Sequence, residues 1–159
     1  MSDSDQLKGK RNAEEHPLYR AACVDDCAST GANLAAPIQA ILYKNPKCTC
    51  CEMYADYLRA NGFDVQLKPT NDLEEISAKA GTPPDLEGCH TMLVDGYAFD
   101  GLVPVDHVKK VLTERPAIAG LTLPGMPTGA PGMPGVKKGP LTIYAFTTDG
   151  KAPTVYAVE

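Results

Sequence analysis

The sequence has no long apolar segment and no concentration of basic residues. No apolar stretch approaches the roughly 20 residues that a helix needs to cross a bilayer, so we expect no membrane span. The 15 Lys and Arg residues are outnumbered by 20 Asp and Glu residues and form no basic stripe, which argues against nucleic acid as a partner. Residues 1–23 also lack the apolar segment of a signal peptide, which leaves open a cytosolic protein and the mature form of an exported one.

The composition is sufficient for one globular domain. Of the 159 residues, 43% are hydrophobic and 22% are charged, which is ordinary for a folded domain with a core. Residues 1–37 are polar with few periodic apolar positions, so we expect a loosely ordered arm there and one domain over 38–159. Gly and Pro, 14 of each, gather in 120–140, and this stretch is predicted to contain neither a helix nor a central strand.

Hydrophobic periodicity predicts strands and helices in alternation from residue 38 onwards. The expected strands cover 38–45, 63–69, 90–94, 97–102, 141–147 and 154–158, and the expected helices cover 50–62, 70–81 and 103–115. Asp95-Gly96 and Asp149-Gly150 are the turns of two predicted hairpins. The order β-α-β-α-β-β-α is that of a thioredoxin-like α/β fold, here with a Gly/Pro/Met-rich loop and a C-terminal β-hairpin. In that fold the loop between the first strand and the first helix carries the cysteine chemistry.

Three of the six cysteines, Cys48, Cys50 and Cys51, crowd into this loop. Three explanations compete, namely a disulfide, a redox thiol pair and a set of thiolates for a soft metal. A helix N-terminus stabilises thiolates in every case. Cys48 and Cys51 have the C-x-x-C spacing of a redox pair, but Cys50 between them would scramble an active disulfide and suits a metal site. Zn²⁺ prefers four separate ligands in a tetrahedron, whereas crowded thiolates suit a small cluster of Cu(I) ions.

Further soft or borderline donors lie elsewhere in the chain. They are Cys89, His90, Met126 and Met133. Cys89 and His90 lie where the third predicted strand begins, and in a thioredoxin-like fold the loop before that strand faces the cysteine loop. Each of them alone is as often structural as functional, but their occurrence together with C-x-C-C favours a metal site, and thioether sulfur favours Cu(I). We interpret His16 and His107 as structural or solvent-facing residues. Cys23 and Cys27 indicate a local disulfide or two free thiols on a turn, with a second metal site as the alternative.

Three segments resemble the CopG-type family of bacterial copper-resistance proteins. They are YKNPKCTCCEMYADYLRANGFDV, GCHTMLVDGYAFDGLVP and GLTLPGMPTGAPGMPG, within about residues 38–147. The resemblance implies a thioredoxin-like fold that binds a thiolate-bridged copper cluster in the periplasm. By position it implies Cys48, Cys50, Cys51 and Cys89 as sulfur ligands, with His90 as a further ligand or a neighbour of one. Met126 and Met133 are added on the soft-donor argument alone.

Three functional hypotheses follow. The first is a periplasmic copper-resistance protein that binds several Cu(I) ions, with cycling between Cu(I) and Cu(II) and exchange of copper with other periplasmic proteins as extensions. The second is a thiol oxidoreductase, because ILYKNPKC also resembles the start of arsenate reductases, with Cys48 attacking and Cys51 or Cys89 resolving. The absence of an Arg near these cysteines in the sequence argues against it. The third is a structural zinc site in a binding module.

Overall fold

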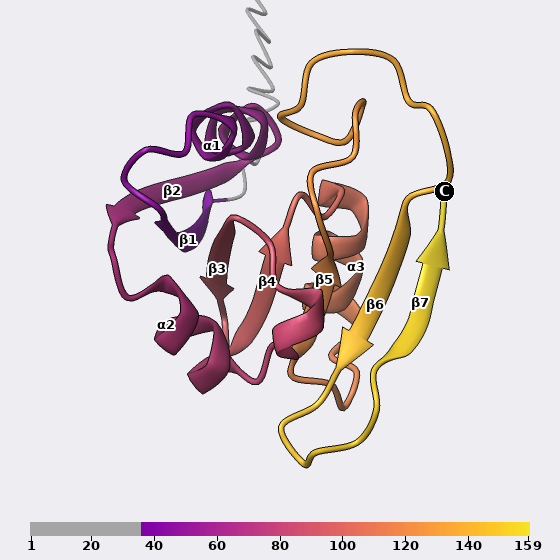
Figure 1. Cartoon of the computed structure of the whole chain (residues 1–159). Helices are drawn as coiled ribbons and strands as arrows, with labels where there is room; N and C mark the ends of the chain where they lie inside the picture. The colour runs from indigo at the N-terminus through magenta and orange to yellow at the C-terminus, as the bar shows by residue number, and fades with distance from the viewer. Residues whose placement is uncertain (1–35) are drawn as a thin grey trace, which may run out of the picture. The chain divides into compact units, whose positions relative to one another are not determined.

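The structure, a computed structural model, describes residues 36–159 (Figure 1). The strands are β1 (Ile38–Lys44), β2 (Phe63–Pro69), β3 (His90–Val94), β4 (Tyr97–Gly101), β5 (Gly120–Leu123), β6 (Thr142–Phe146) and β7 (Thr154–Val158). The helices are α1 (Cys50–Ala60), α2 (Leu73–Ala80), α3 (Val105–Glu114) and the short 3₁₀ helix η1 (Pro84–Leu86). None of the helices in this range has the length and apolar character needed to cross a bilayer. The predicted arm, with His16, Cys23 and Cys27, lies outside the described residues apart from its last two positions.

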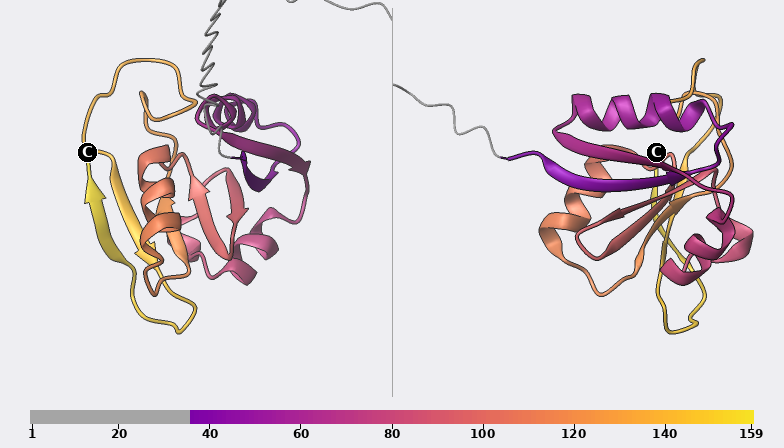
Figure 2. Two further views of the ribbon diagram at one scale, coloured as in Figure 1. Left: turned by 180° about the vertical axis from the view of Figure 1, so that it is seen from behind. Right: turned by 90° about the vertical axis from the view of Figure 1, so that its left-hand side faces the viewer.

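The seven strands form one mixed sheet in the order β2-β1-β3-β4-β5-β6-β7. β1 pairs with β2 and β4 with β5 in parallel, and the other neighbours are antiparallel. The first four strands and the three α-helices reproduce the predicted thioredoxin-like order. α2 and α3 cover opposite faces of the sheet (Figure 2). The hydroxyl of Tyr54 on α1 donates to the carbonyl of Val103 at the entrance to α3, so these two helices meet on one side.

The strand and helix limits follow largely from local signals. β2 alternates buried and exposed side chains at its start, as expected for a strand with one face on the core. Asp95 and Gly96 both have positive φ angles, 48° and 86°, as a two-residue hairpin turn requires, and the predicted β3–β4 hairpin is confirmed. Gly81 ends α2 with a φ of 89°. The N-cap of α2 is Asp72.

The prediction that 120–140 contains no central strand is wrong for Gly120–Leu123, which form β5 between β4 and β6. Gly120 is needed where the two strands come close, because a Cβ at this position would lie 1.8 Å from the carbonyl oxygen of Ala98. β5 also changes the role of the C-terminal hairpin. β6 pairs with β5, so the predicted hairpin of β6 and β7 extends the central sheet.

Candidate metal centre

The register of β1 and β3 explains how cysteines far apart in the sequence come together. His90 at the start of β3 is paired with Lys44 at the end of β1. Cys89 therefore lies beside the turn that follows Lys44. That turn is closed by a hydrogen bond from the N–H of Cys48 to the carbonyl of Asn45, and α1 begins two residues later with Cys50. The approach of Cys89 to the cysteine loop, expected from the thioredoxin-like fold, is observed.

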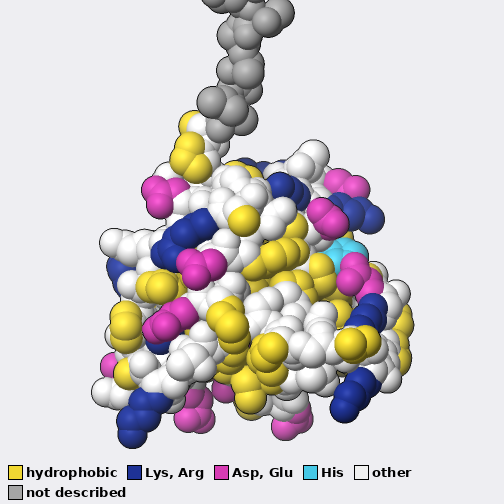
Figure 3. Space-filling view, turned by 90° about the horizontal axis from the view of Figure 1, so that it is seen from above, with side chains coloured by type: hydrophobic (Ala, Val, Ile, Leu, Met, Phe, Trp, Pro, Cys, Tyr) yellow, Lys and Arg dark blue, Asp and Glu magenta, His cyan; other side chains and the backbone are white. Residues whose placement is uncertain are grey.

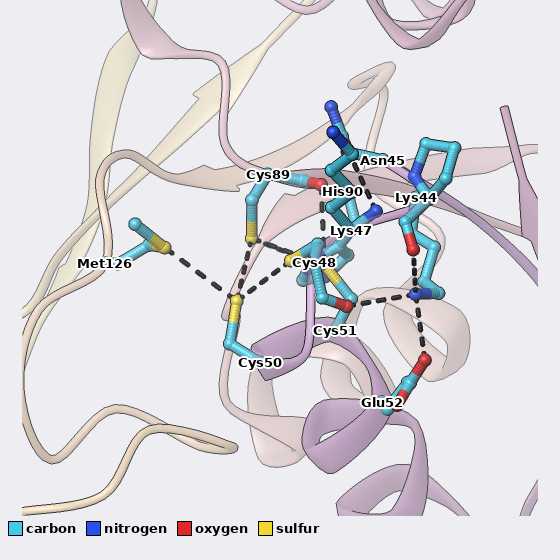
Figure 4. Close-up of a disulfide and its surroundings, with 11 residues drawn as sticks. Lys44, Asn45, Lys47, Cys48, Cys50, Cys51, Glu52, Cys89, His90 and Met126 are labelled. Carbon is cyan, nitrogen blue, oxygen red and sulfur yellow. Dashed lines mark hydrogen bonds and ion pairs between the residues drawn. A yellow bond between two sulfur atoms is a disulfide. The ribbon is translucent and has the colours of Figure 1, made fainter. Parts of the chain in front are cut away.

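The four sulfur atoms of Cys48, Cys50, Cys51 and Cys89 all lie within 4.8 Å of one another (Figure 4). Cys48 and Cys51 form a disulfide, which is one of the three explanations that the sequence left open. Cys50 and Cys89 are free thiols. The Sγ of Cys50 lies 3.0 Å from that of Cys48 and 3.5 Å from that of Cys89, and the Sγ of Cys51 lies 3.5 Å from that of Cys89. After reduction of the disulfide, these atoms are a group that could hold metal.

The Gly/Pro/Met-rich loop brings one thioether to the sulfur group. The Sδ of Met126 lies 3.8 Å from the Sγ of Cys50, and the Met126 side chain is 56% exposed. Met133 lines the same open pocket of about 670 Å³, but it makes no sulfur hydrogen bond to a cysteine of the described range. On the face seen in Figure 3, hydrophobic side chains gather near the centre, with charged side chains mostly around them. The structure therefore offers both thioethers to one pocket, and one of them in contact with a thiol.

His90 is completely buried under the sulfur group. Its ring packs against Tyr54 with the centroids 4.7 Å apart, and its Nδ1 lies 3.5 Å from the Sγ of Cys89. Burial lowers the pKa of His90 to about 4, although the backbone carbonyl of Gly101 partly opposes the change. The ring is neutral at neutral pH, so Nδ1 can serve as a metal ligand or accept a hydrogen bond from Cys89.

The thiol of Cys89 is held in its protonated form when no cation is near. Burial, reinforced by the neighbouring Cys50, raises the pKa of Cys89 to about 12. A coordinated metal ion deprotonates a thiol outright, because its charge outweighs the cost of burial. Metal binding at Cys89 is therefore expected to release a proton.

Two buried charged residues that sequence analysis missed hold the two sides of the sulfur group. The Lys44 amine donates to the carbonyl of Cys48 and to Glu52 Oε1, both at 3.0 Å, and so ties the cysteine loop to α1. Asp100 accepts the N–H of Gly88, directly before Cys89. Burial raises the pKa of Asp100, although this and other hydrogen bonds to the carboxylate oppose the change. Asp100 interrupts an apolar strand segment in the sequence, which is a signal that could have identified it, whereas Lys44 is the last residue of β1 and stands out by no such signal.

Comparisons with known proteins agree with this geometry. Two solved structures, titled "Copper resistance protein copG- Form 1" and "Copper resistance protein copG- Form 2", each match with 31% sequence identity and a TM-score of 0.71, over 77% of this chain and 98% of theirs. The chain belongs to the CopG-type family of copper-resistance proteins. A family model described as "Protein of unknown function, DUF411" matches residues 86–133. A search of curated proteins found no significant match. The CopG-type resemblance and the fold class inferred from the sequence are confirmed.

Proposed function

We propose that this CopG-type chain is a periplasmic copper-resistance protein that binds several Cu(I) ions in a thiolate-bridged cluster. The observation that supports it is the approach of four cysteine sulfurs to within 4.8 Å of one another beside a pocket that both loop methionines line. Soft thiolate sulfurs select Cu(I), zinc or iron–sulfur clusters, and the thioethers beside them favour Cu(I) among these. Sulfurs this close can share ions by bridging, which suits a cluster of several ions.

The proposed ligands differ in their chemical state in this structure. Cys50 and Cys89 are thiols already, and Cys48 and Cys51 become ligands when their disulfide is reduced. Met126 adds a thioether in contact with Cys50. Two further ligands complete the proposed set. His90 would bind copper through Nδ1, and Met133 would bind it after its side chain moves within the pocket that it lines.

Location and copper exchange form part of the same proposal. A disulfide between Cys48 and Cys51 fits an oxidising compartment such as the periplasm. Met53 and Met126, exposed by 44% and 56%, line the sulfur pocket. Exposed thioethers at the mouth of a Cu(I) site provide a path by which other periplasmic copper-handling proteins could deliver or remove copper. The proposal includes cycling of the bound copper between Cu(I) and Cu(II).

The substitution Cys50→Ser tests the proposal, because Cys50 contacts three other sulfur atoms. Reduced protein is loaded with Cu(I) without oxygen, separated from free copper, and analysed for metal per chain. We expect Cys50→Ser to bind at most about half of the parent's copper, since the thiolate that joins the other donors is lost. The matched control Cys23→Ser should bind as much copper as the parent. Unchanged stoichiometry in Cys50→Ser would contradict a cluster centred on this loop, and zinc retained in preference to Cu(I) would indicate a structural zinc site.

A second candidate, a thiol oxidoreductase of the arsenate-reductase type, is favoured by the C-x-x-C disulfide. An oxyanion substrate also needs a basic group, and the pocket is lined by one such residue among those described, Lys47. Arg59 is engaged with Asp56, and Arg115 with Asp95. Arsenate-dependent turnover in a thiol-coupled assay would support this candidate, and its absence would leave the copper proposal.

A further inference from the structure

The sulfur group combines an oxidised pair with two reduced thiols. Resting on the proposed copper function, we propose that Cys48 and Cys51 together reduce Cu(II) to Cu(I), and that their disulfide is the product of this reaction. The thiols of Cys50 and Cys89 then hold the Cu(I) that is formed. The same four cysteines would thus act as an electron donor and as a binding site.

The reaction balances without a further reactant. Two Cu²⁺ ions and the thiols of Cys48 and Cys51 give two Cu⁺ ions, one disulfide and two protons. Each thiolate supplies one electron, the sulfur–sulfur bond forms between the two oxidised atoms, and the protons leave to solvent. The reaction stops after one turnover, because the disulfide holds no more electrons to give.

The positions of the sulfurs assign the donor role to Cys48 and Cys51. They have C-x-x-C spacing at the start of an 11-residue helix, where the unpaired N–H groups favour the thiolate that is oxidised. The other two cysteines, Cys50 and Cys89, lie 3.5 Å apart and remain thiols in the same structure. The division between a bonded pair and two free thiols is therefore already present in this structure.

The remaining donors suit the product better than the substrate. When the Cys48–Cys51 bond has formed, Cys50 still lies 3.5 Å from the Sγ of Cys89 and 3.8 Å from the Sδ of Met126. Two thiolates and a thioether are soft ligands that favour Cu(I) over Cu(II). His90 is the one imidazole in contact with a described cysteine of the group. Retention of Cu(I) by these sulfurs therefore drives the oxidation of the pair.

The accessible side of the disulfide provides a route to reset the pair. Cys48 is partly exposed, whereas Cys51 is completely buried. A dithiol reductant would attack the Sγ of Cys48, release Cys51 as a thiolate and form a mixed disulfide with Cys48. The second thiol of the reductant would then displace Cys48, leaving both cysteines reduced and the reductant oxidised.

The test uses the full chain with Cys23→Ser and Cys27→Ser, so that the four cysteines of the sulfur group are the only thiols. The reduced protein receives two equivalents of Cu(II) without oxygen and is separated from small molecules. Cu(I) is measured with a chromogenic Cu(I) chelator after unfolding, thiols by alkylation and mass spectrometry, and disulfides by peptide mapping. We expect about two Cu(I) retained per chain, two thiols lost and the new disulfide between Cys48 and Cys51.

Variants separate the donation of electrons to Cu(II) from the binding of Cu(I). Cys50→Ser should still reduce Cu(II) and form the Cys48–Cys51 disulfide, but lose Cu(I) during the separation. Cys51→Ser should reduce Cu(II) roughly tenfold more slowly or worse, because the aligned pair is gone. Cys48→Ser, at the partly exposed position, should behave in the same way and replaces Cys51→Ser if that variant does not fold.

Two outcomes would overturn the inference, namely a disulfide that maps elsewhere while Cys48 and Cys51 stay reduced, and full-rate reduction by Cys48→Ser. Direct addition of Cu(I) to the reduced protein tests the proposed function independently of the inference. If Cu(I) does not bind, the proposed function fails. If Cu(I) binds but Cu(II) does not oxidise the pair, the inference alone fails.

Discussion

His90 shows how a single side chain can join the core to the sulfur group. Its Nδ1 faces the Sγ of Cys89, while its Nε2 forms no hydrogen bond of good geometry within residues 36–159. The ring contacts Tyr54, whose own side chain is fully buried. An unpaired buried nitrogen is costly, and ionising it inside the core would cost more. The neutral ring is consequently the form compatible with the folded chain.

We predict that His90 makes the metal-free protein sensitive to acid. Its pKa is 6.5 in the unfolded chain and about 4 in the folded chain. The unfolded chain therefore binds the proton at higher pH, so stability is fully present above pH 6.5 and is lost as the pH falls towards 4. The difference corresponds to about 3 kcal/mol of unfolding free energy.

The substitution His90→Phe should remove this acid sensitivity. Phe retains the contact with Tyr54 and leaves no buried nitrogen unpaired, so at pH 7.5 its unfolding free energy should lie within about 1 kcal/mol of the parent's. Urea unfolding of both metal-free proteins at pH 7.5 and pH 4.5 measures the effect. An equal loss of stability in parent and variant at the lower pH would show that other groups cause it.

At the scale of elements, the long loop of residues 124–141 is held against α1 by a close backbone contact. Gly132 has a φ of 79°, and a Cβ there would lie 2.8 Å from the backbone nitrogen of Tyr54. Neither backbone can move away without shifting the loop or the helix. The contact therefore contributes to the placement of Met126 next to Cys50.

We predict that Gly132→Ala weakens Cu(I) binding without removing a sulfur atom. The methyl group should push the loop away from α1, and the loss of one thioether ligand should lower the Cu(I) affinity roughly tenfold. Competition with a Cu(I) chelator measures the affinity. Gly139→Ala is the matched control, because a Cβ at Gly139 meets nothing within 4 Å. Equal affinities for the two variants would show that the loop position does not matter.

The elements that the sequence predicted correctly are those with local signals. The hairpin at Asp95-Gly96 and the end of α2 at Gly81 depend on residues that accept positive φ angles, and such residues are visible in the sequence. β5 was not predicted because the reason for a glycine at position 120 lies on another strand. The carbonyl oxygen of Ala98 on β4 leaves no room for a side chain there. A glycine that breaks a strand and one that allows two strands to approach look the same in a single sequence.

The candidate site also combines features that the sequence predicts with features that only the folded chain reveals. The approach of Cys89 to the cysteine loop followed from the order of strands, since a thioredoxin-like sheet places the start of β3 beside the end of β1. The roles of Lys44 and Asp100 depend on burial and on partners that only the folded chain brings together. The choice of the Cys48–Cys51 pair over other pairings also needed sulfur positions.

At the scale of the whole molecule, the candidate donors come from separate parts of the chain. Cys50 lies 39 positions from Cys89 and 76 from Met126 in the sequence, yet its sulfur contacts both. An unfolded chain does not hold these groups together, so copper that binds them stabilises the folded state. The sulfur contacts that the structure describes join residues within 36–159, and these residues lie in one compact unit.

We therefore predict that a chain of residues 36–159 alone folds and binds as much copper as the full chain. The contacts around Cys50, Cys89 and Met126 are all retained in it, so its thermal midpoint should match that of the full chain, with and without Cu(I). Calorimetry and metal analysis of both proteins provide the comparison. A lower copper content in the shorter chain would instead assign ligands to Cys23 and Cys27. The full chain carrying Cys23→Ser and Cys27→Ser would then have to show the same deficit, because it differs from its parent in those two sulfurs alone.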